Sequence, residues 1–354
     1  MKVLLISSDN LFIVPYLSFY LNLIERNGIE YKVIYWDKVG NETMHGSNFI
    51  RFCCATNGKI GRMLGYVKFR SIILSTLKNE NFDLIIPLHA QVNVLIADKL
   101  LGTFKKRFIF DVRDYSYERF KVFRYIQSLL VKNSMINIIS SAGYKSFLPK
   151  GHYWVCHNIP PVLDATYKQY KNCSARPIEI SYIGSIRFME QNKKIILFFK
   201  NDSRFHINFI GVNAFKLKKF CNENGIKNVT LVDEFSPNDT LKFFGRADMI
   251  MNLYGNHNPL LDYALSNKLY YSVYLYKPIL VCRYTYMETI AKKYHLGFSL
   301  ELKDLKEKDN LYRYIRFLNR NQYIRNCDYF WKKVLADNIR LNKKLDECLK
   351  NLKG

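Results

Sequence analysis

Short apolar runs recur along the chain, separated by segments whose apolar residues repeat with helical spacing. The first run, KVLLIS, ends in small polar residues, as a buried parallel strand does. A helix is predicted over about 13–26, with Asn27-Gly28 as its stop, and EYKVIYW forms the next strand. Strands that alternate with helices in this way predict an α/β fold with a parallel sheet covered on both faces.

The alternation continues, is interrupted once, and then starts again. Helices are predicted near 60–77, 92–101 and 120–132, between the strands FDLIIPLH, RFIFDV, MINIISS and HYWVCHN. A proline-rich polar stretch follows, and the strands IEISYIGS, FHINFIG, VTLVDEF, ADMIMNLY and KPILVC come after it. We therefore predict a first Rossmann-like domain over 1–160, a linker over 161–177, a second such domain over 178–310 and a helical segment over 311–354.

Two α/β halves of similar size, joined by a linker, are the organisation of an enzyme with a cleft between its domains. In open parallel sheets, ligands bind outside the carboxyl ends of the strands. The default site is therefore the cleft that the two halves are expected to form.

The net charge is +24, from 54 Lys and Arg against 30 Asp and Glu. Such an excess predicts an anionic partner, which could be nucleic acid, an acidic membrane surface or a phosphorylated ligand, although a solvated lysine-rich surface explains it equally well. The eight cysteines form no C-x-x-C pair and are typical of free thiols in a reducing compartment. No apolar stretch is long enough to span a bilayer, so we expect a cytoplasmic protein.

The turn after one strand of the second half is a candidate phosphate site. In YIGSIR, Gly184 and Ser185 end the strand and Arg187 follows. Glycine lets the backbone approach a ligand closely, and arginine binds phosphate with two parallel hydrogen bonds. The alternative is an ordinary strand-to-helix turn with surface cations.

A stronger signal is the segment SNKLYYSVYLYKPILV. Ser266 or Asn267 can cap a helix whose first N–H groups then point outward, and Lys268 adds a full positive charge. A phosphate group fits such a helix terminus. Tyr270 and Tyr274, four residues apart, would instead pack that helix into the core. Both interpretations can hold, because one concerns the tip of the helix and the other its side.

In the first half, two residues at strand ends are candidates for acid–base work. His89 ends the strand FDLIIPLH and titrates near neutrality in its ordinary state. Asp114 lies in the cluster FDVRDYSYER. The alternatives are a hydrogen-bonded structural histidine, and an ion pair of Asp114 with Arg113 or Arg119.

Two predicted helices of the first half carry cations among apolar residues, in GKIGRMLGYVKFR and FKVFRYIQSLLVK. Basic amphipathic helices of this kind rest on anionic lipid leaflets. The alternative is that their apolar residues pack on the sheet and the cations are merely solvated.

The order of these features resembles glycosyltransferases of the GT-B fold, in particular the family-four type of bacterial capsular and surface polysaccharide biosynthesis. SYIGSIR is similar to that family's strand, glycine turn and arginine, and SNKLYYSVYLYKPILV to its diphosphate-binding helix and following strand. The resemblance implies two Rossmann-like domains facing a cleft, with the C-terminal helix packing back toward the first domain. It also implies donor diphosphate binding by Gly184, Ser185, Arg187, Ser266, Asn267 and Lys268.

The sequence departs from the family pattern at three positions. Tyr271 occupies the position of the glutamate that bonds the nucleotide ribose, and Tyr276 that of a glycine before Lys-Pro. Near the donor sugar, the family has a second glutamate where this chain has Tyr263, beside Asp262. We expect Asp262, Tyr263 and Tyr271 to supply the ribose or sugar contacts.

The sequence therefore favours a hexosyl-type glycosyltransferase that moves a sugar from a UDP- or GDP-linked donor to a membrane-associated, lipid-linked glycan. The resemblance implies retention of anomeric configuration. With no D-x-D motif in the chain, we expect no metal and no cofactor, because cations and a helix dipole can neutralise the leaving diphosphate. The expected location is the inner face of the cell membrane. A nucleic-acid-binding protein and a GT-B-fold sugar-nucleotide epimerase are the alternatives, although no nucleic-acid-binding signature is present.

Overall fold

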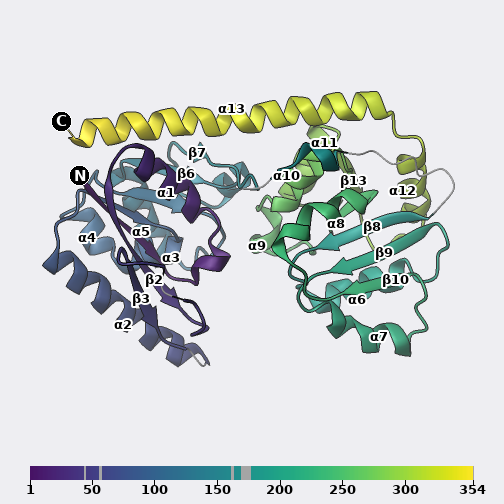
Figure 1. Ribbon diagram of the computed structural model, residues 1–354, viewed down its shortest axis with the longest axis horizontal. Coiled ribbons are helices and arrows are strands. Elements are labelled where there is room, and N and C mark those ends of the chain that lie inside the picture. Colours follow the sequence, from purple (N-terminus) through teal and green to yellow (C-terminus); the bar gives the residue numbers. More distant parts are fainter. Residues whose placement is uncertain (44, 56–57, 161–162, 169–176, 354) are drawn as a thin grey trace. The chain divides into compact units, whose positions relative to one another are not determined.

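The computed structural model describes residues 1–43, 45–55, 58–160, 163–168 and 177–353 (Figure 1). The chain divides into two compact units. Unit 1 comprises Met1–His157 with Asp337–Gly354, and unit 2 comprises Asn158–Ala336. Of the linker expected over 161–177, residues 161–162 and 169–176 lie outside the described residues.

Unit 1 is built on parallel strands in the order β3-β2-β1-β4, and a parallel bridge from Ile85 to Phe108 leads into β5-β6-β7. The strand that sequence patterns did not predict is β3, a short edge strand with a single buried residue, Phe52. The strands are β1 (Lys2–Ser7), β2 (Glu30–Asp37), β3 (Phe49–Cys53), β4 (Leu84–Pro87), β5 (Ile109–Val112), β6 (Ile136–Ile139) and β7 (Trp154–Val155).

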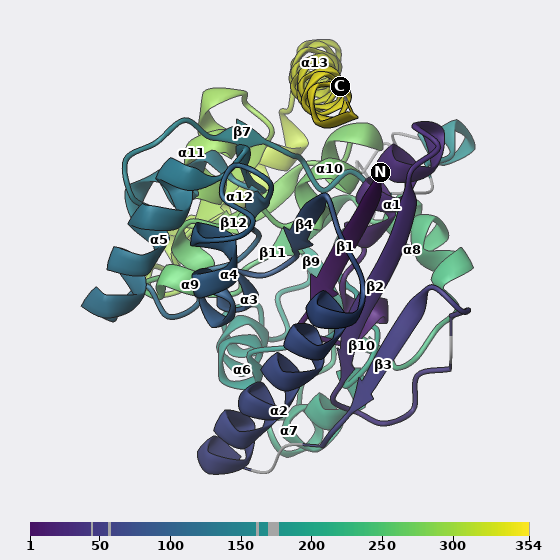
Figure 2. The ribbon, with the colours of Figure 1, turned by 90° about the vertical axis from the view of Figure 1, so that its left-hand side faces the viewer.

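Helices cover both faces of this sheet. On one face, α1 packs through Leu17, Tyr20 and Leu23 against alternate strand residues such as Val3 and Leu5. On the other, the ring of Trp36 from β2 contacts Phe69 of α2, which lies along the outside of the unit (Figure 2). The helices are η1 (Leu11–Ile13), α1 (Leu17–Arg26), α2 (Gly58–Asn79), α3 (Ala90–Leu95), α4 (Ala97–Leu101), α5 (Lys121–Asn133) and η2 (Ala142–Ser146).

The last helix, α13 (Arg320–Lys353), belongs to both units, since the division falls between residues 336 and 337. In its second half, Leu341, Leu345 and Leu349 recur every four residues and are fully buried in the unit 1 core beside α1. Arg26 of α1 forms an ion pair with Asp346 at 3.0 Å. The predicted packing of the C-terminal helix on the first domain is confirmed.

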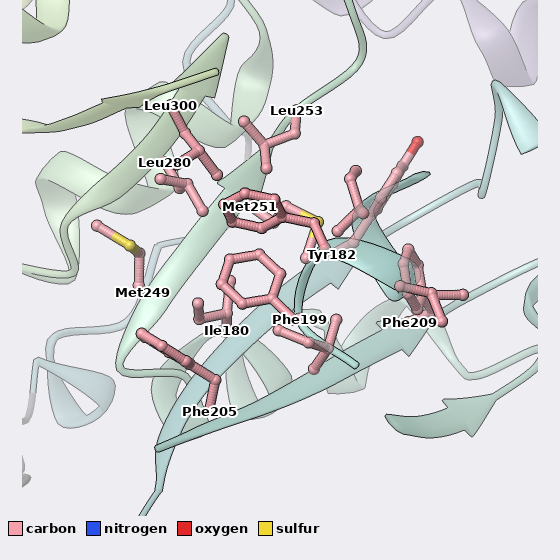
Figure 3. Close-up of a cluster of buried hydrophobic side chains, with 14 of the residues drawn as sticks. Ile180, Tyr182, Phe199, Phe205, Phe209, Met249, Met251, Leu253, Leu280 and Leu300 are labelled. Carbon is pink, nitrogen blue, oxygen red and sulfur yellow. The ribbon is translucent and has the colours of Figure 1, made fainter. Parts of the chain in front are cut away.

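Unit 2 has a six-stranded parallel sheet in the order β10-β9-β8-β11-β12-β13. This order reverses direction between β8 and β11, as in the doubly wound nucleotide-binding fold. Apolar residues of these strands form the core of the unit, and Figure 3 shows side chains of β8, β9 and β11 packed with Phe199 and Leu300. The strands are β8 (Ile178–Ile183), β9 (Phe205–Ile210), β10 (Val229–Val232), β11 (Met249–Asn252), β12 (Ile279–Cys282) and β13 (Gly297–Leu300).

The unit 2 helices place two loops at the carboxyl edge of the sheet. The turn after β8 leads into α6, and α10 begins just before β12 in the chain. The helices are η3 (Ala165–Tyr167), α6 (Met189–Phe198), η4 (Ala214–Leu217), α7 (Lys218–Glu223), η5 (Pro237–Asp239), α8 (Thr240–Arg246), α9 (Pro259–Asp262), α10 (Asn267–Tyr274), α11 (Tyr286–Lys293) and α12 (Lys306–Arg316). Across the described ranges, no helix is both long and apolar enough to cross a bilayer.

Candidate functional site

Two glycine turns meet at the carboxyl edge of the unit 2 sheet. Gly184 follows β8 with φ +111°, and Gly211 follows β9 with φ +132°, both values that favour glycine. A Cβ atom on Gly211 would lie 2.2 Å from the carbonyl oxygen of Gly184. The two turns therefore approach each other backbone to backbone, at a distance that a side chain at position 211 would not allow.

The turn after β8 is closed by its own tyrosine. The Tyr182 hydroxyl donates to the carbonyl of Ser185 (3.1 Å) and accepts from the backbone N–H of Arg187 (3.2 Å). Ser185 and Arg187 are exposed at the tip of this turn. The predicted residues Gly184, Ser185 and Arg187 thus form one rigid loop.

Lys268 is buried beside this turn. It is 7% exposed, and its Nζ lies 3.8 Å from the position of a Cβ on Gly184. The Nζ donates to the Tyr254 hydroxyl at 2.6 Å and lies over the rings of Tyr182 and Tyr254, 4.5 and 5.2 Å from their centroids. Burial lowers the pKa of Lys268 from 10.5 to about 8, with Tyr182 acting in the opposite direction and the charge of Arg187 lowering it further.

Neither cation of this site has a counter-charge among the residues that the structure describes, since no carboxylate there lies within ion-pair distance of Lys268 or Arg187. The charge of Arg187 is close enough to Lys268 to lower its pKa. Lys193, by contrast, pairs with Glu190 at 2.7 Å on neighbouring α6. Two like charges held together, one of them buried, are stabilised by an anion placed between them.

The tip of α10 completes the arrangement. Ser266 is the N-cap, and its hydroxyl accepts from the N–H of Lys268 at 3.3 Å. Asn267 is the first helical residue and is exposed. The side of α10 is core, because Tyr270 is fully buried, while Tyr274 packs against a different apolar cluster. The helix therefore combines a capped, open tip with a packed side.

The three expected ribose or sugar contacts lie on two elements. Asp262 ends the short helix α9, and one of its carboxylate oxygens is buried with no hydrogen-bond partner among the described residues. Tyr263 follows it, half-buried. Tyr271 on α10 stacks on Phe244 of α8, with ring centroids 4.3 Å apart and planes 14° apart. Its ring thus packs against the protein, and a ribose contact stays a prediction for all three.

One family departure has a local explanation. Tyr276, where the family has glycine, adopts φ +55°. Its hydroxyl donates to Asp328 of α13 at 2.8 Å, a contact that offsets part of the strain of a left-handed backbone at a residue other than glycine.

In unit 1, His89 follows β4 and is the N-cap of α3. Its Nδ1 accepts from the N–H of Ser8 at 3.3 Å, and its Nε2 lies 3.8 Å from a carboxylate oxygen of Asp9. Burial lowers the pKa of His89 to about 4, although Asp9 raises it. The ring is therefore neutral at pH 7 with its proton on Nε2, rather than titrating near neutrality as the sequence suggested.

The acidic cluster after β5 separates into two parts. Asp111 is fully buried, accepts from the Tyr20 hydroxyl at 2.6 Å and pairs with Arg113 at 2.7 Å. The Arg113 guanidinium also lies 4.5 Å from the ring centroid of Tyr16. This network is structural, whereas Asp114 is exposed beyond it. Asp114 and His89 lie in the same unit, and a catalytic role for either stays a prediction.

Two tyrosines of the unit 2 site were not found from the sequence. Tyr182 and Tyr254 enclose the Lys268 ammonium from β8 and from the loop after β11. Each ends an apolar strand run at the sheet edge, as does the glycine turn. That shared position is the signal that could have identified them, since aromatic rings at the carboxyl edge of a parallel sheet lie where a cation that binds a ligand is placed.

Comparison with solved structures gives the fold a name. The chain is similar to sucrose-phosphate synthase from Thermosynechococcus elongatus, with TM-score 0.70 and 10% identity over 98% of this chain and 99% of that one. It is also similar to Anabaena HepE in complex with UDP and glucose (TM-score 0.65, 13% identity, 98% and 100% covered). The lipopolysaccharide outer core galactosyltransferase WaaB, in its apo form, matches with TM-score 0.65 and 12% identity over 99% of each chain.

These neighbours are glycosyltransferases of the GT-B type, and the predicted fold, two Rossmann-like parallel-sheet domains, is confirmed. No family model and no curated protein matches the sequence. At 9–13% identity the likeness concerns the fold alone.

Proposed function

We propose that this protein is a glycosyltransferase that takes a sugar from a UDP- or GDP-linked donor. The observation that carries the proposal is Lys268, a buried lysine without a carboxylate partner among the described residues. The diphosphate would lie at the tip of α10, between Lys268 and Arg187 and against the backbone of Gly184 and Ser185. HepE, of similar fold, binds UDP and glucose, which supports this assignment.

In the transfer, the bond between the sugar C1 and the diphosphate oxygen breaks, and the diphosphate leaves with the electron pair. The acceptor oxygen forms the new bond to C1 and loses its proton. The two cations and the helix terminus neutralise the leaving group, so no metal ion is required in the proposal. His89, neutral at pH 7, offers Nε2–H to a substrate oxygen, and the Asp114 carboxylate accepts the proton. We further propose retention at C1, which NMR of the product tests.

For the acceptor we propose a lipid-linked glycan of cell-surface polysaccharide synthesis, used at the cytoplasmic face of an anionic membrane. The support is the cationic character of α2 and α5, both in the unit expected to bind the acceptor. Nucleic acid is not the proposed partner, so a random oligonucleotide should show no salt-sensitive binding. Transfer of labelled sugar to a membrane lipid extract tests the lipid-linked acceptor, and the same assay with EDTA tests whether the reaction needs a metal ion. Release of an epimerised nucleotide sugar without transfer would favour the epimerase.

Thermal unfolding with UDP, GDP, CDP and their monophosphates tests the donor site directly. A ligand at about a hundred times its dissociation constant adds about 2.7 kcal/mol of stability. Arg187→Ala should weaken binding of the preferred diphosphate by about 1–3 kcal/mol, as loss of a charged hydrogen bond does. Lys193→Ala is the matched control, because Lys193 already pairs with Glu190. Equal affinity in Arg187→Ala and the parent protein would remove the proposed site.

A further inference from the structure

The first half of α2 exposes apolar side chains to solvent. The exposed fractions are 74% for Ile60, 63% for Met63, 53% for Leu64 and 59% for Val67. The spacing of three, four and seven residues places all four on one face of the helix. Single exposed apolar residues are ordinary, but a contiguous group of four marks a surface that contacts something.

This stripe, Ile60, Met63, Leu64 and Val67, is not the face by which α2 packs on its own sheet. Phe69 and Ile73 are fully buried there, and the Tyr66 and Phe69 rings contact Trp36 of β2. The helix therefore has two apolar faces. The expectation that the apolar residues of this segment pack on the sheet is correct for the inner face and wrong for the outer one.

The charge around the stripe has one sign. The segment of α2, GKIGRMLGYVKFRSIILSTLKN, contains five Lys and Arg and no Asp or Glu. Arg62, between Ile60 and Met63 in sequence, and Lys68, directly after Val67, are both exposed. The segment of α5, KVFRYIQSLLVKN, also lacks acidic residues and exposes Val122 (71%) and Tyr125 (65%). An ordinary solvated helix mixes both signs, as α13 does.

We infer that the stripe on α2 inserts into the headgroup–acyl boundary of an anionic bilayer, with the neighbouring cations on the lipid phosphates. This deepens the membrane partner named under the proposed function and rests on it for its biological purpose. An apolar face flanked by cations, on a helix without acidic residues, is the composition of interfacial helices. A protein partner would have to supply a surface that is both apolar and acidic.

Insertion and purely electrostatic adsorption differ in their response to salt. Screening removes the attraction of exposed cations to lipid phosphates, whereas buried apolar area keeps its contribution. The parent protein should therefore keep measurable sedimentation with phosphatidylglycerol vesicles at 0.5 M NaCl. The double variant Met63→Ser/Leu64→Ser should lose about tenfold or more of its vesicle partition coefficient and all high-salt binding.

A matched control exists on α13, where Leu335 is 39% and Ile339 is 55% exposed among charges of both signs. The double variant Leu335→Ser/Ile339→Ser removes comparable apolar groups and should leave vesicle binding unchanged. Thermal unfolding of each variant, without and with the preferred nucleotide diphosphate, shows that unit 2 is intact. If Met63→Ser/Leu64→Ser loses vesicle binding but keeps the nucleotide-induced thermal shift of the parent protein, the membrane contact is tested independently of the donor site.

A second probe reports insertion directly. Met63→Trp should show a blue-shifted emission and quenching by brominated lipid when phosphatidylglycerol vesicles are added, measured against the parent's three tryptophans. Unquenched emission, or parental vesicle binding in the Met63→Ser/Leu64→Ser variant, would overturn the inference. Dimer formation would overturn it as well. In that case sedimentation equilibrium would give a dimer mass for the parent and a monomer mass for Met63→Ser/Leu64→Ser, while vesicle binding would be the same in both.

Discussion

Removing the buried charge of Lys268 should make the unliganded protein more stable while abolishing its response to nucleotide. The difference between the ordinary pKa of 10.5 and the buried value of about 8 corresponds to about 3 kcal/mol. Lys268→Met removes that cost at pH 7 and keeps most of the apolar stem. It also loses the hydrogen bond to Tyr254, which contributes about 1 kcal/mol. The net expectation is a gain of about 2 kcal/mol.

The pH dependence gives this prediction its sign. Between about pH 8 and 10.5, folded Lys268 is neutral while the unfolded chain still binds the proton. Stability of the parent protein therefore rises with pH across that window, because the unfolded state holds more protons. The advantage of Lys268→Met should shrink over the same window, since the variant has no such group.

The assay is urea and thermal unfolding of the parent and Lys268→Met at pH 7 and pH 10, without ligand, followed by thermal scans with the preferred nucleotide diphosphate. At pH 7 the thermal midpoint of the unliganded variant should rise by about 4 °C or more, given about 2–4 °C per kcal/mol for a unit of this size. Lys193→Met, a surface substitution, should change stability by less than about 0.5 kcal/mol. A variant that is less stable than the parent at pH 7, or a difference that does not change with pH, would refute the reasoning.

Three further predictions concern other parts of the molecule. Gly211→Ala should destabilise by at least about 2 kcal/mol in urea unfolding, because its Cβ would meet the Gly184 carbonyl at 2.2 Å, whereas Gly225→Ala, with open space around it, should cost about 1 kcal/mol. Asp111→Asn should cost about 3–5 kcal/mol by removing the carboxylate charge that the buried Arg113 guanidinium faces, and an unchanged urea midpoint would contradict that network. His89→Ala should leave the nucleotide-induced thermal shift intact and lower sugar transfer in a radiolabel assay; parental transfer would exclude a catalytic role.

Periodicity alone was sufficient for most of the fold. Strands buried on both faces are rich in apolar residues, so β1, β4, β11 and β12 are visible as apolar runs, and β8 (IEISYI) as alternating apolar residues. The edge strand β3 was missed because one residue of five is buried. The helix expected over 92–101 is broken at Ile96 into α3 and α4, a backbone detail that apolar spacing does not encode.

The candidate donor site was also predictable only in part. The sequence determined which residues stand at strand ends and helix caps, since Gly184, Arg187, Ser266 and Lys268 are recognisable from local chemistry. It could not indicate that Lys268 is buried between two tyrosine rings, because that enclosure depends on how β8 and the loop after β11 come together in the folded sheet.

Tertiary structure also decided which apolar face of α2 is core. Both faces carry similar residues, and no local pattern distinguishes them; only contact with Trp36 buries one and leaves the stripe exposed. Burial, and with it the pKa of Lys268 and of His89, depends on the atoms that surround a side chain and not on its neighbours in sequence. The sequence by itself therefore specified the elements and their chemical groups, and the tertiary structure decided which of those groups carry unbalanced charge or exposed apolar surface.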